Sequence, residues 1–343
     1  MEKNQKTLIE NLHKAGKGIM PFVKPLEDLC WKKDFDNNSW YVIGHFEAEG
    51  HKLNFLVHFM LMDIEGMEPN LHSTVSITDE TTGFYFGEHK LFPLSDIGIS
   101  DKGFNIKAPT ASMSGGLDQM HVQATIPLGK IDVTMKMDGY PLYNGGTGYF
   151  PMFSIDVYQY SLPTMDTIGT ITIKNKTYEI NGTSWFDRQW QNQTSALSGH
   201  WCWMDLNLDN GDKISLWSSV DHLTGSENAW ATILHPDGSQ TLTAIEPLSL
   251  SESDYWLSTK SGQNYPTHWI VKIPELDACL EVTPSPREQE LITNFDLLSK
   301  REQELIAKAD FLNTYEGASS VKGTYRGKET TGYCYVELVG LWK

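Results

Sequence analysis

The order of apolar and polar residues along this 343-residue chain predicts mostly short β-strands. Runs rich in Val, Ile, Thr, Tyr and Trp alternate with turn-forming stretches. Such stretches include 113–116 (MSGG), 173–176 (IKNK), 209–212 (DNGD) and 235–239 (HPDGS). Helical segments do not alternate with these runs, as they would in a parallel α/β sheet. The pattern therefore predicts an all-β protein, built as a sandwich or a barrel.

A helical pattern interrupts the strands near residues 285–313. It begins with SPRE at 285–288, which has the residues of a capping box and a proline at the first helical position. Apolar residues then follow mostly at steps of three and four, at Leu291, Phe295, Leu298, Leu305, Ala309 and Leu312. The hexapeptide REQELI occurs at 287–292 and again at 301–306, which we interpret as a local duplication. We predict a short helical insertion, as one bent helix or two, that packs on its own domain or joins two copies of the chain.

A long-range repeat suggests that the chain has two related halves. The segments SWYVIGHFEAEGHKL (39–53) and HWCWMDLNLDNGDKI (200–214) align without gaps, so that Trp40 matches Trp201. Each segment is typical of a β-hairpin, with a tryptophan in its first strand and a glycine in its turn. We predict that each hairpin opens one half of the chain.

A second repeat closes the two halves. Its members share one spacing and are Gly182, Trp185 and Asp187 in the first half and Gly332, Tyr335 and Glu337 in the second. We therefore predict two similar β domains related by duplication, at 26–195 and 196–343. A lead-in at 1–25 precedes them and is expected to form a short helix.

The formal net charge of −17 limits the partners of the protein. No basic stripe is present, which argues against nucleic acids and anionic membrane surfaces as partners. The longest apolar stretch, at 53–62, is interrupted by His58 and is too short to span a bilayer. The N-terminus lacks the apolar segment of a signal peptide, so we predict a soluble, cytoplasmic protein.

The sequence lacks the common motifs for metals and cofactors. It contains no HxxxH, HxH or HExxH pattern, no GxGxxG after a strand, no phosphate-binding loop and no GxSxG elbow. The four cysteines, at 30, 202, 279 and 334, lack CxxC spacing and are predicted to be free thiols. We therefore predict no metal site and no cofactor.

Asp187 is the main candidate for chemistry because it lies among large aromatic residues in GTSWFDRQWQNQ (182–193). In a strand, Trp185, Asp187 and Gln189 share one face, whereas Phe186 and Arg188 lie on the other. If the first face lines the interior, burial raises the pKa of Asp187 and makes it a candidate general acid. Alternatively, Asp187 is structural and accepts hydrogen bonds from backbone or indole N–H groups at the barrel closure, or pairs with a remote Lys or Arg. The residues alone leave both interpretations open.

Two other aromatic clusters are candidates for contact with a ligand. Trp201 and Trp203 share a strand face, where they could hold a cationic intermediate or form a core layer. Tyr158 and Tyr160 also share a face, where they could orient a ligand, relay a proton or form an aromatic pair.

Several of these segments together resemble one family. They are NNSWYVIGHFEAEG, LHSTVSITDETTGFYF, VYQYSLP, GTSWFDRQW, HWCWMDLNLDNG and YEGASSVKGTYRGKETTGYCYVELVG, in this order from about residue 37 to 341. The chain resembles the lipocalin-like carotenoid 1,2-hydratases (hydroxyneurosporene synthases), and its architecture is similar to that of fungal Diels–Alderases. The WFDRQW block and the final block are the more specific parts of this resemblance.

The resemblance implies two calycin-like β-barrel domains in tandem, with a ligand cavity in or between them. It also implies chemistry without a cofactor. In the carotenoid hydratases, an acid protonates an alkene and water captures the resulting carbocation. The family's aromatic-x-Asp block falls on Trp185 and Asp187, and its aromatic pair falls near Tyr158 and Tyr160.

We therefore expect an enzyme that acts on a hydrophobic terpenoid, polyene or polyketide-like molecule by acid-assisted hydration, elimination or cyclisation. Asp187 and Tyr158 are the predicted catalytic residues. The predicted ligand-binding residues are Trp40, Tyr160, Trp185, Gln189, Trp201 and Trp203. The alternative is a non-enzymatic carrier of an apolar ligand, in which Asp187 is ion-paired away from that ligand. The sequence leaves the oligomeric state open.

Overall fold

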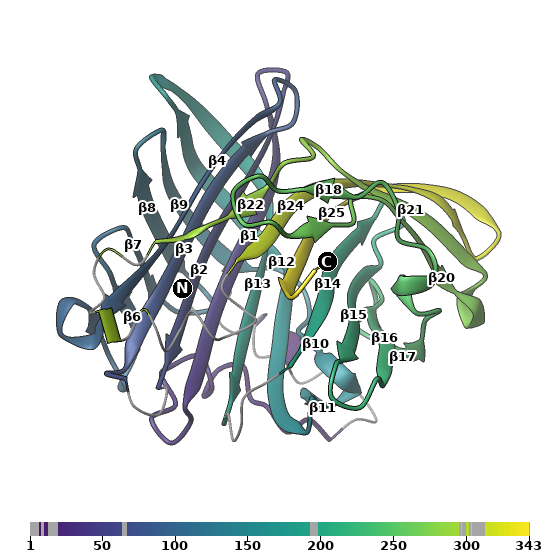
Figure 1. The fold of residues 1–343 in the computed structure, drawn as a ribbon, viewed down its shortest axis with the longest axis horizontal. Helices are drawn as coiled ribbons and strands as arrows, with labels where there is room; N and C mark the ends of the chain where they lie inside the picture. Colours follow the sequence, from purple (N-terminus) through teal and green to yellow (C-terminus); the bar gives the residue numbers. More distant parts are fainter. Residues whose placement is uncertain are drawn as a thin grey trace. The chain divides into compact units, whose positions relative to one another are not determined.

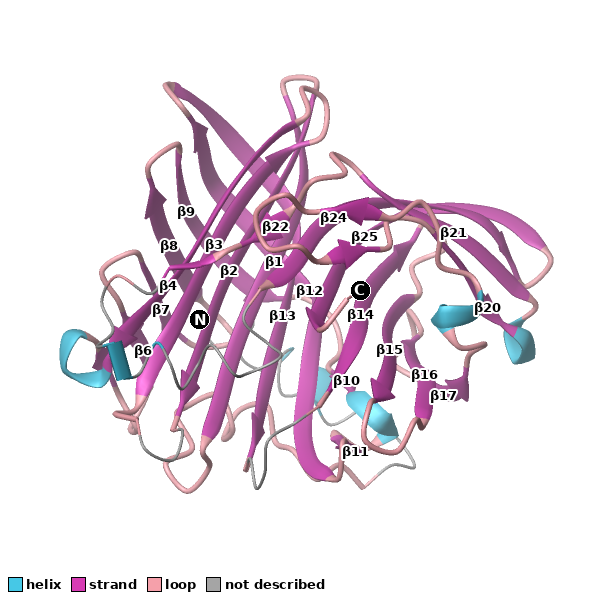
Figure 2. Cartoon of the chain, viewed as in Figure 1, coloured by secondary structure: helices cyan, strands magenta, loops and turns pink. Residues whose placement is uncertain are grey.

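The computed structural model confirms the all-β prediction and shows two curled sheets (Figure 2). It describes residues 7, 10–12, 20–63, 67–192, 198–294, 296, 300, 301, 303 and 313–342. The chain divides into two compact units. Unit 1 comprises Met1–Thr194 and Thr293–Glu302, and unit 2 comprises Ser195–Ile292 and Gln303–Lys343.

Unit 1 contains one antiparallel sheet, apart from a short parallel edge, with 14 strands among the described residues (Figure 1). Its long strands are β1 (Asn37–Ala48), β2 (His51–Met62), β3 (Asn70–Asp79), β4 (Phe84–Pro93), β8 (Met120–Ile126), β9 (Gly129–Met137), β12 (Ile155–Ile173) and β13 (Lys176–Gln191). Its short strands are β5 (Gly98–Ile99), β6 (Phe104–Lys107), β7 (Ala111–Gly115), β10 (Leu142–Tyr143), β11 (Tyr149–Met152) and β23 (Thr293–Asn294). The order is β23-β4-β3-β2-β1-β13-β12-β9-β8-β7-β6-β5, and β10 and β11 pair with β12.

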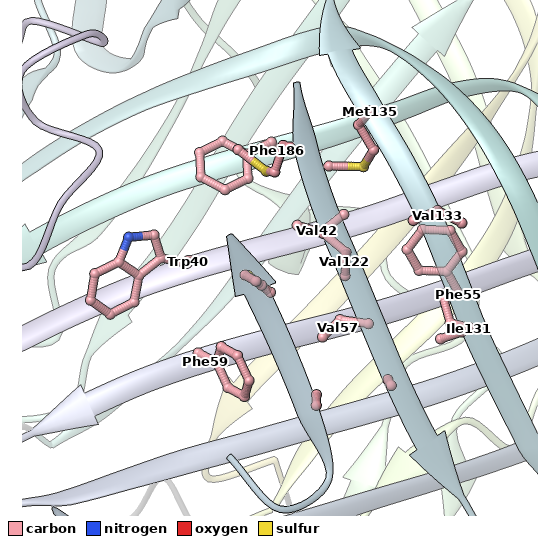
Figure 3. Close-up of a cluster of buried hydrophobic side chains, with 14 of the residues drawn as sticks. Trp40, Val42, Phe55, Val57, Phe59, Val122, Ile131, Val133, Met135 and Phe186 are labelled. Carbon is pink, nitrogen blue, oxygen red and sulfur yellow. The ribbon is translucent and has the colours of Figure 1, made fainter. Parts of the chain in front are cut away.

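The unit 1 sheet curls around a single apolar core (Figure 3). Alternate side chains of β1 and β2, such as Trp40 and Phe59, belong to the same cluster as Val122 of β8 and Ile131 of β9. The approach is close where β9 begins, because a Cβ atom on Gly129 would lie 2.3 Å from Ile77 Cδ1 of β3. Strands far apart in the sheet order therefore share one interior.

Residues 20–36 pack against this core before β1 begins. Val23 and Leu29 are buried members of the cluster. The Trp40 Nε1 group donates a 2.7 Å hydrogen bond to the Leu29 carbonyl, and the Tyr160 hydroxyl donates to the Pro25 carbonyl at 3.2 Å. The interior aromatics of unit 1 are thus tied to this segment.

Unit 2 contains a nine-stranded antiparallel sheet among its described residues, in the order β17-β16-β15-β14-β25-β24-β21-β20, with β22 on β24. Its strands are β14 (Gly199–Leu208), β15 (Lys213–Asp221), β16 (Glu227–Leu234), β17 (Gln240–Ala244), β20 (Trp269–Ile273), β21 (Ala278–Pro284), β22 (Glu290–Leu291), β24 (Thr314–Tyr325) and β25 (Lys328–Gly340). A separate two-stranded sheet joins β18 (Trp256–Leu257) to β19 (Asn264–Tyr265). The core of unit 2 includes Cys202, Met204 and Leu206 from β14 and Val336 and Leu338 from β25.

Both predicted hairpins are present, but their side-chain faces differ. In β1–β2, Ala48 pairs with His51 around a two-residue turn in which Gly50 has φ +80°. In β14–β15 the loop is longer, because Asn207 pairs with Lys213. Trp40 points into the unit 1 core, whereas Trp201 lies on the face of β14 opposite the core residue Cys202. The gapless alignment therefore pairs the two hairpins, but the side chains that it aligns point to opposite faces of their sheets.

The predicted helix is wrong for residues 285–294. Glu290–Leu291 forms β22 on β24, and Thr293–Asn294 forms β23, parallel to β4. The buried Gln289 side chain donates to the carbonyl of Ala318 and accepts from the amide of Ala318. These tertiary hydrogen bonds hold the chain extended and override the local capping signal. Residues 300, 301 and 303 are helical, and the rest of the predicted insertion lies outside the described residues.

Further predictions from the sequence concern the lead-in helix, the cysteines and the membrane. Residues 7 and 10–12 are helical, and the remaining residues of the predicted lead-in helix before residue 20 lie outside the described residues. All four cysteines are free thiols. Within the part of the chain that the structure describes, no helix is long and apolar enough to cross a membrane. The cytoplasmic location stays a prediction.

The close approach of β9 to β3 predicts that Gly129→Ala destabilises unit 1. The new methyl group would meet Ile77 and, at 3.0 Å, the Thr172 carbonyl. Such overpacking typically costs about 1–3 kcal/mol in the free energy of unfolding. Urea denaturation measures this change. Gly103→Ala is the control, because a Cβ atom there has no neighbour within 4 Å. Equal stability of the two variants would contradict the packing described.

Candidate functional site

Strand β13 separates the predicted site residues onto the two faces of the unit 1 sheet. Phe186 and Trp190 point into the apolar core, so Trp185, Asp187 and Gln189 point to the opposite face. We call this opposite face of β12, β13, β1, β2, β3 and β4 the acid face. Asp187 therefore does not line the apolar interior of the unit 1 sheet.

Tyr158, Tyr160 and Trp40 lie on the core side of the sheet, away from Asp187. The Tyr158 ring stacks on Trp190, with ring centroids 5.7 Å apart and an interplanar angle of 6°. Tyr160 and Trp40 are fully buried members of the core cluster, and burial raises the pKa of Tyr160. The predicted aromatic residues of unit 1 are thus not gathered around the predicted acid.

Arg188 is also on the core side and has a structural role. Its guanidinium donates to the carbonyls of Asp28 and Cys30 and to Asn38 Oδ1, at 2.8–2.9 Å. It lies over the Trp40 ring, 4.4 Å from the centroid. Burial lowers the pKa of Arg188 to about 10. The guanidinium therefore joins the segment before β1 to the end of β13.

The Asp187 carboxyl is buried and receives hydrogen bonds from two neutral groups. The side chain is 5 % exposed. Trp185 Nε1 donates to Oδ1 at 2.6 Å, and Gln159 Nε2 donates to Oδ2 at 2.9 Å. The indole hydrogen bond is the one that the structural interpretation of Asp187 expected. These donors also fix the orientation of the carboxyl, which general acid catalysis requires.

The sheet register places Asp187 in a polar row that crosses the acid face. Successive partners on neighbouring strands are Ser161, Asp187, Tyr41, His58, Thr74, His89 and Thr293. Neighbouring strands lie about 4.8 Å apart, so the row extends over roughly 29 Å. An acid, a phenol and two imidazoles from four separate strands are thus aligned on one face.

The histidines of the acid face are held neutral. Burial lowers the pKa of His58 to about 3 and that of His89 to about 4, and the positive charge that His89 would carry adds to the effect at His58. His58 Nε2 lies 2.9 Å from Ser39 Oγ, and its ring centroid is 5.0 Å from that of Tyr41. His72 Nδ1 lies 3.1 Å from His89 Nε2. Neutral imidazoles near neutral pH are able to accept a proton.

Gln159, Tyr41 and the histidines of this face were not among the residues predicted from the sequence. One local signal was present, because His58 interrupts an apolar stretch between the core residues Val57 and Phe59. A polar residue at the alternate position of such a strand indicates a second face with its own role. The alignment of Asp187 with Tyr41 and His58 required the strand register.

In unit 2, the predicted residues Trp201 and Trp203 also lie opposite the core. Trp203 Nε1 donates to Ser215 Oγ at 3.0 Å. Trp203 belongs to a register row whose members are Glu316, Glu337, Trp203, Trp217 and Trp230. Asp205 accepts hydrogen bonds from the Tyr335 amide and from Asn207 Nδ2. Unit 2 therefore has its own acidic and aromatic face, while Asp205 has local structural partners.

Residues 22–341 match the AttH-like family, and the chain belongs to this family. The resemblance to carotenoid 1,2-hydratases that the sequence suggested is a broader relationship. The match covers both units, in agreement with the duplicated pattern of hairpins and closing strands.

Two sequence relatives have names that describe the removal or addition of water. The dehydratase asqC of Emericella nidulans is 28 % identical over 233 residues, which cover 65 % of this chain and 61 % of asqC. The kievitone hydratase of Fusarium solani subsp. phaseoli is 25 % identical over 249 residues, which cover 71 % of this chain and 65 % of that protein. The alignments thus span somewhat less than two thirds of each relative.

Solved structures show that the fold is shared over nearly the whole chain. The kievitone hydratase of Nectria haematococca has a TM-score of 0.77 at 19 % identity and covers 96 % of both chains. The structure of CghA, a Diels–Alderase-like protein, has a TM-score of 0.60 at 11 % identity and covers 94 % of both chains. The expected similarity in architecture to Diels–Alderases is confirmed.

The hydrogen bonds of Arg188 predict that Arg188→Lys destabilises the protein. A lysine ammonium lacks the planar arrangement of donors that reaches Asp28, Cys30 and Asn38 together. Losing hydrogen bonds from a buried charged group should cost about 2–4 kcal/mol. Thermal and urea denaturation measure the loss. The same substitution at exposed Arg326 is the control, and an equally small effect at both sites would show that Arg188 is not structural.

The lowered pKa of His89 predicts a loss of stability in acid. The side chain is 6 % exposed and stays neutral down to about pH 4, whereas an unfolded histidine binds a proton below about pH 6.5. The unfolded state is therefore favoured progressively as the pH falls from 6.5 to 4, by up to roughly 3 kcal/mol.

Urea denaturation at pH 7 and pH 4.5 tests this pH dependence. His89→Gln should lose less stability between the two pH values than the wild type. His222→Gln, at an exposed position, should behave like the wild type. The assignment to His89 fails if wild type and His89→Gln show the same difference.

Proposed function

We propose that this protein is an enzyme that adds water to, or removes water from, a hydrophobic small molecule. Asp187 is the acid, and its buried carboxyl held by Trp185 and Gln159 is the observation that carries the proposal. The names of the two sequence relatives, a dehydratase and a hydratase, support the reaction class. The proposal requires no metal and no organic cofactor.

In dehydration, protonated Asp187 donates its proton to the hydroxyl oxygen of the substrate. The C–O bond breaks, water leaves with the bonding electron pair, and the carbon becomes cationic. The π face of Trp185, next to Asp187 on the acid face, stabilises this cation electrostatically. The adjacent carbon then loses a proton to His58, the C=C bond forms, and solvent returns a proton from His58 to Asp187. Hydration is the same sequence in reverse.

The neutral imidazole of His58 is the proposed base. It is two strands from Asp187 in the same register row, with Tyr41 between them. The two backbone positions are therefore about 10 Å apart. The lowered pKa of His58 keeps its ring unprotonated near neutral pH, and a weak base is sufficient to take a proton from the carbon next to a carbocation.

Tyr158 is not part of this machinery, because it stacks on Trp190 at the opposite face of the sheet. A non-enzymatic carrier is the weaker candidate. The names of the two sequence relatives, a dehydratase and a hydratase, favour an enzyme over a carrier.

Asp187→Asn is expected to remove hydratase activity and to leave the fold intact. An amide of the same shape cannot protonate the hydroxyl oxygen, so turnover should fall by about 10²–10⁴-fold. Kievitone, named in one relative, is the first substrate to test, followed by a panel of terpenoid and polyketide alkenes and alcohols. Mass spectrometry detects the gain or loss of one water.

The assay contains EDTA and no added nucleotide, because the proposed reaction uses only side chains. Asp166→Asn, at an exposed position on β12, is the matched control and should keep full activity. An Asp187→Asn variant that still hydrates its substrate would refute the acid role. If that variant cyclises a polyene without a change in mass, the active site acts by shape instead.

A further inference from the structure

Side-chain amides form a strip on the acid face, beside the proposed acid. Gln159 of β12 pairs with Gln189 of β13, and Gln191 of β13 pairs with Asn37 of β1. Strand alternation places all four side chains on the same face as Asp187. We call Gln159, Gln189, Gln191 and Asn37 the amide strip.

Two members of the amide strip have buried oxygen atoms that lack a hydrogen-bond donor. Gln159 is 2 % exposed and Asn37 is 4 % exposed. Neither Gln159 Oε1 nor Asn37 Oδ1 has a hydrogen-bond partner among the described residues. A buried acceptor without a donor costs about 1–3 kcal/mol, so such atoms typically mark a place where a donor binds.

The orientation of the Gln159 amide follows from its contact with the acid. Its Nε2 group donates to Asp187 Oδ2, which directs Oε1 away from that carboxylate oxygen. Gln159 therefore offers an acceptor beside Asp187. Gln189 and Gln191 are only half-buried and are joined by a 3.0 Å hydrogen bond. Gln159 and Asn37 are therefore the buried members of the strip, and the two half-buried glutamines lie between them.

We propose that Gln159 Oε1 accepts a hydrogen bond from the hydroxyl group that is lost or gained in the reaction, and so places its oxygen next to Asp187. This inference rests on the proposed function of Asp187. It defines the substrate class as hydrophobic alcohols and the alkenes derived from them. Ethers and ketones lack the donor that an amide oxygen requires.

Dehydration begins at the hydroxyl group that Gln159 holds. Asp187 protonates the hydroxyl oxygen, the C–O bond breaks, and water leaves with the bonding electron pair. The adjacent carbon loses a proton to the His58 imidazole, and the C=C bond forms. Gln159 keeps its hydrogen bond to the departing water and positions the same water for the reverse reaction.

The test compares an alcohol with its methyl ether. Geraniol and geranyl methyl ether differ only in the hydroxyl hydrogen and one methyl group. Their binding to the full-length protein is measured by isothermal titration and by quenching of tryptophan fluorescence. Wild type should bind the alcohol about 5–10-fold more tightly, as expected for one hydrogen bond. Equal binding of the two, or no binding of the alcohol, overturns the proposal.

Variants of Gln159 test whether the preference for the alcohol over the ether depends on Gln159 Oε1. Gln159→Met keeps the length of the side chain but removes the acceptor, and should abolish the preference. Gln159→Glu keeps acceptor oxygens and should retain it. Gln123→Met is the matched control, because Gln123 also donates to an aspartate, Asp132, but lies on β8. A preference that survives in folded Gln159→Met overturns the proposal.

The result for Gln159 can be distinguished from the result for the proposed acid role of Asp187. Asp187→Asn should lose turnover, and the preference for the alcohol is scored in wild type and the Gln159 variants, because an amide at position 187 no longer fixes the orientation of Gln159. If turnover survives in Asp187→Asn, the acid role fails and the binding role of Gln159 is still decided by the titrations. If the alcohol preference is absent, the inference about Gln159 fails whatever the turnover shows.

Discussion

Strand β13 presents its side chains alternately to the apolar core and to the acid face, and the rest of the structure depends on this alternation. Asp187 and Arg188 are neighbours in the chain but point in opposite directions. Arg188 is satisfied by carbonyls and Asn38 on the core side, and so does not hold Asp187 as an ion pair. Asp187 instead accepts hydrogen bonds from an indole and an amide.

Strand register turns this single acid into a site. Pairing through β1 and β2 brings Tyr41 and His58 into line with Asp187. A slip of one residue in any of these strands would move its polar side chains into the apolar core. The cost of burying an imidazole or a carboxyl there keeps the register fixed. The same constraint that stabilises unit 1 therefore assembles its candidate chemistry.

The duplication is visible in the closing strands and is less regular in the opening hairpins. Asp187 and Glu337 both lie opposite the core of their own unit. Trp40 and Trp201 do not correspond in this way, because Trp40 lies in the core of unit 1 and Trp201 lies opposite the core of unit 2. The two sheets therefore share an architecture, while the chemistry of their non-core faces differs. Unit 1 has imidazoles and amides there, and unit 2 has glutamates and tryptophans.

The sequence by itself determined the strands, both hairpins and the separation of Trp185 and Asp187 from Phe186 and Arg188, because these features follow from local alternation. It could not determine which face of β13 meets the core, since both faces carry large aromatic side chains. It also favoured a helix at 285–294, where hydrogen bonds of Gln289 with residues far along the chain hold extended structure. Only the tertiary structure aligned the histidines and Gln159 with Asp187, because register between strands distant in sequence depends on packing and not on local pattern.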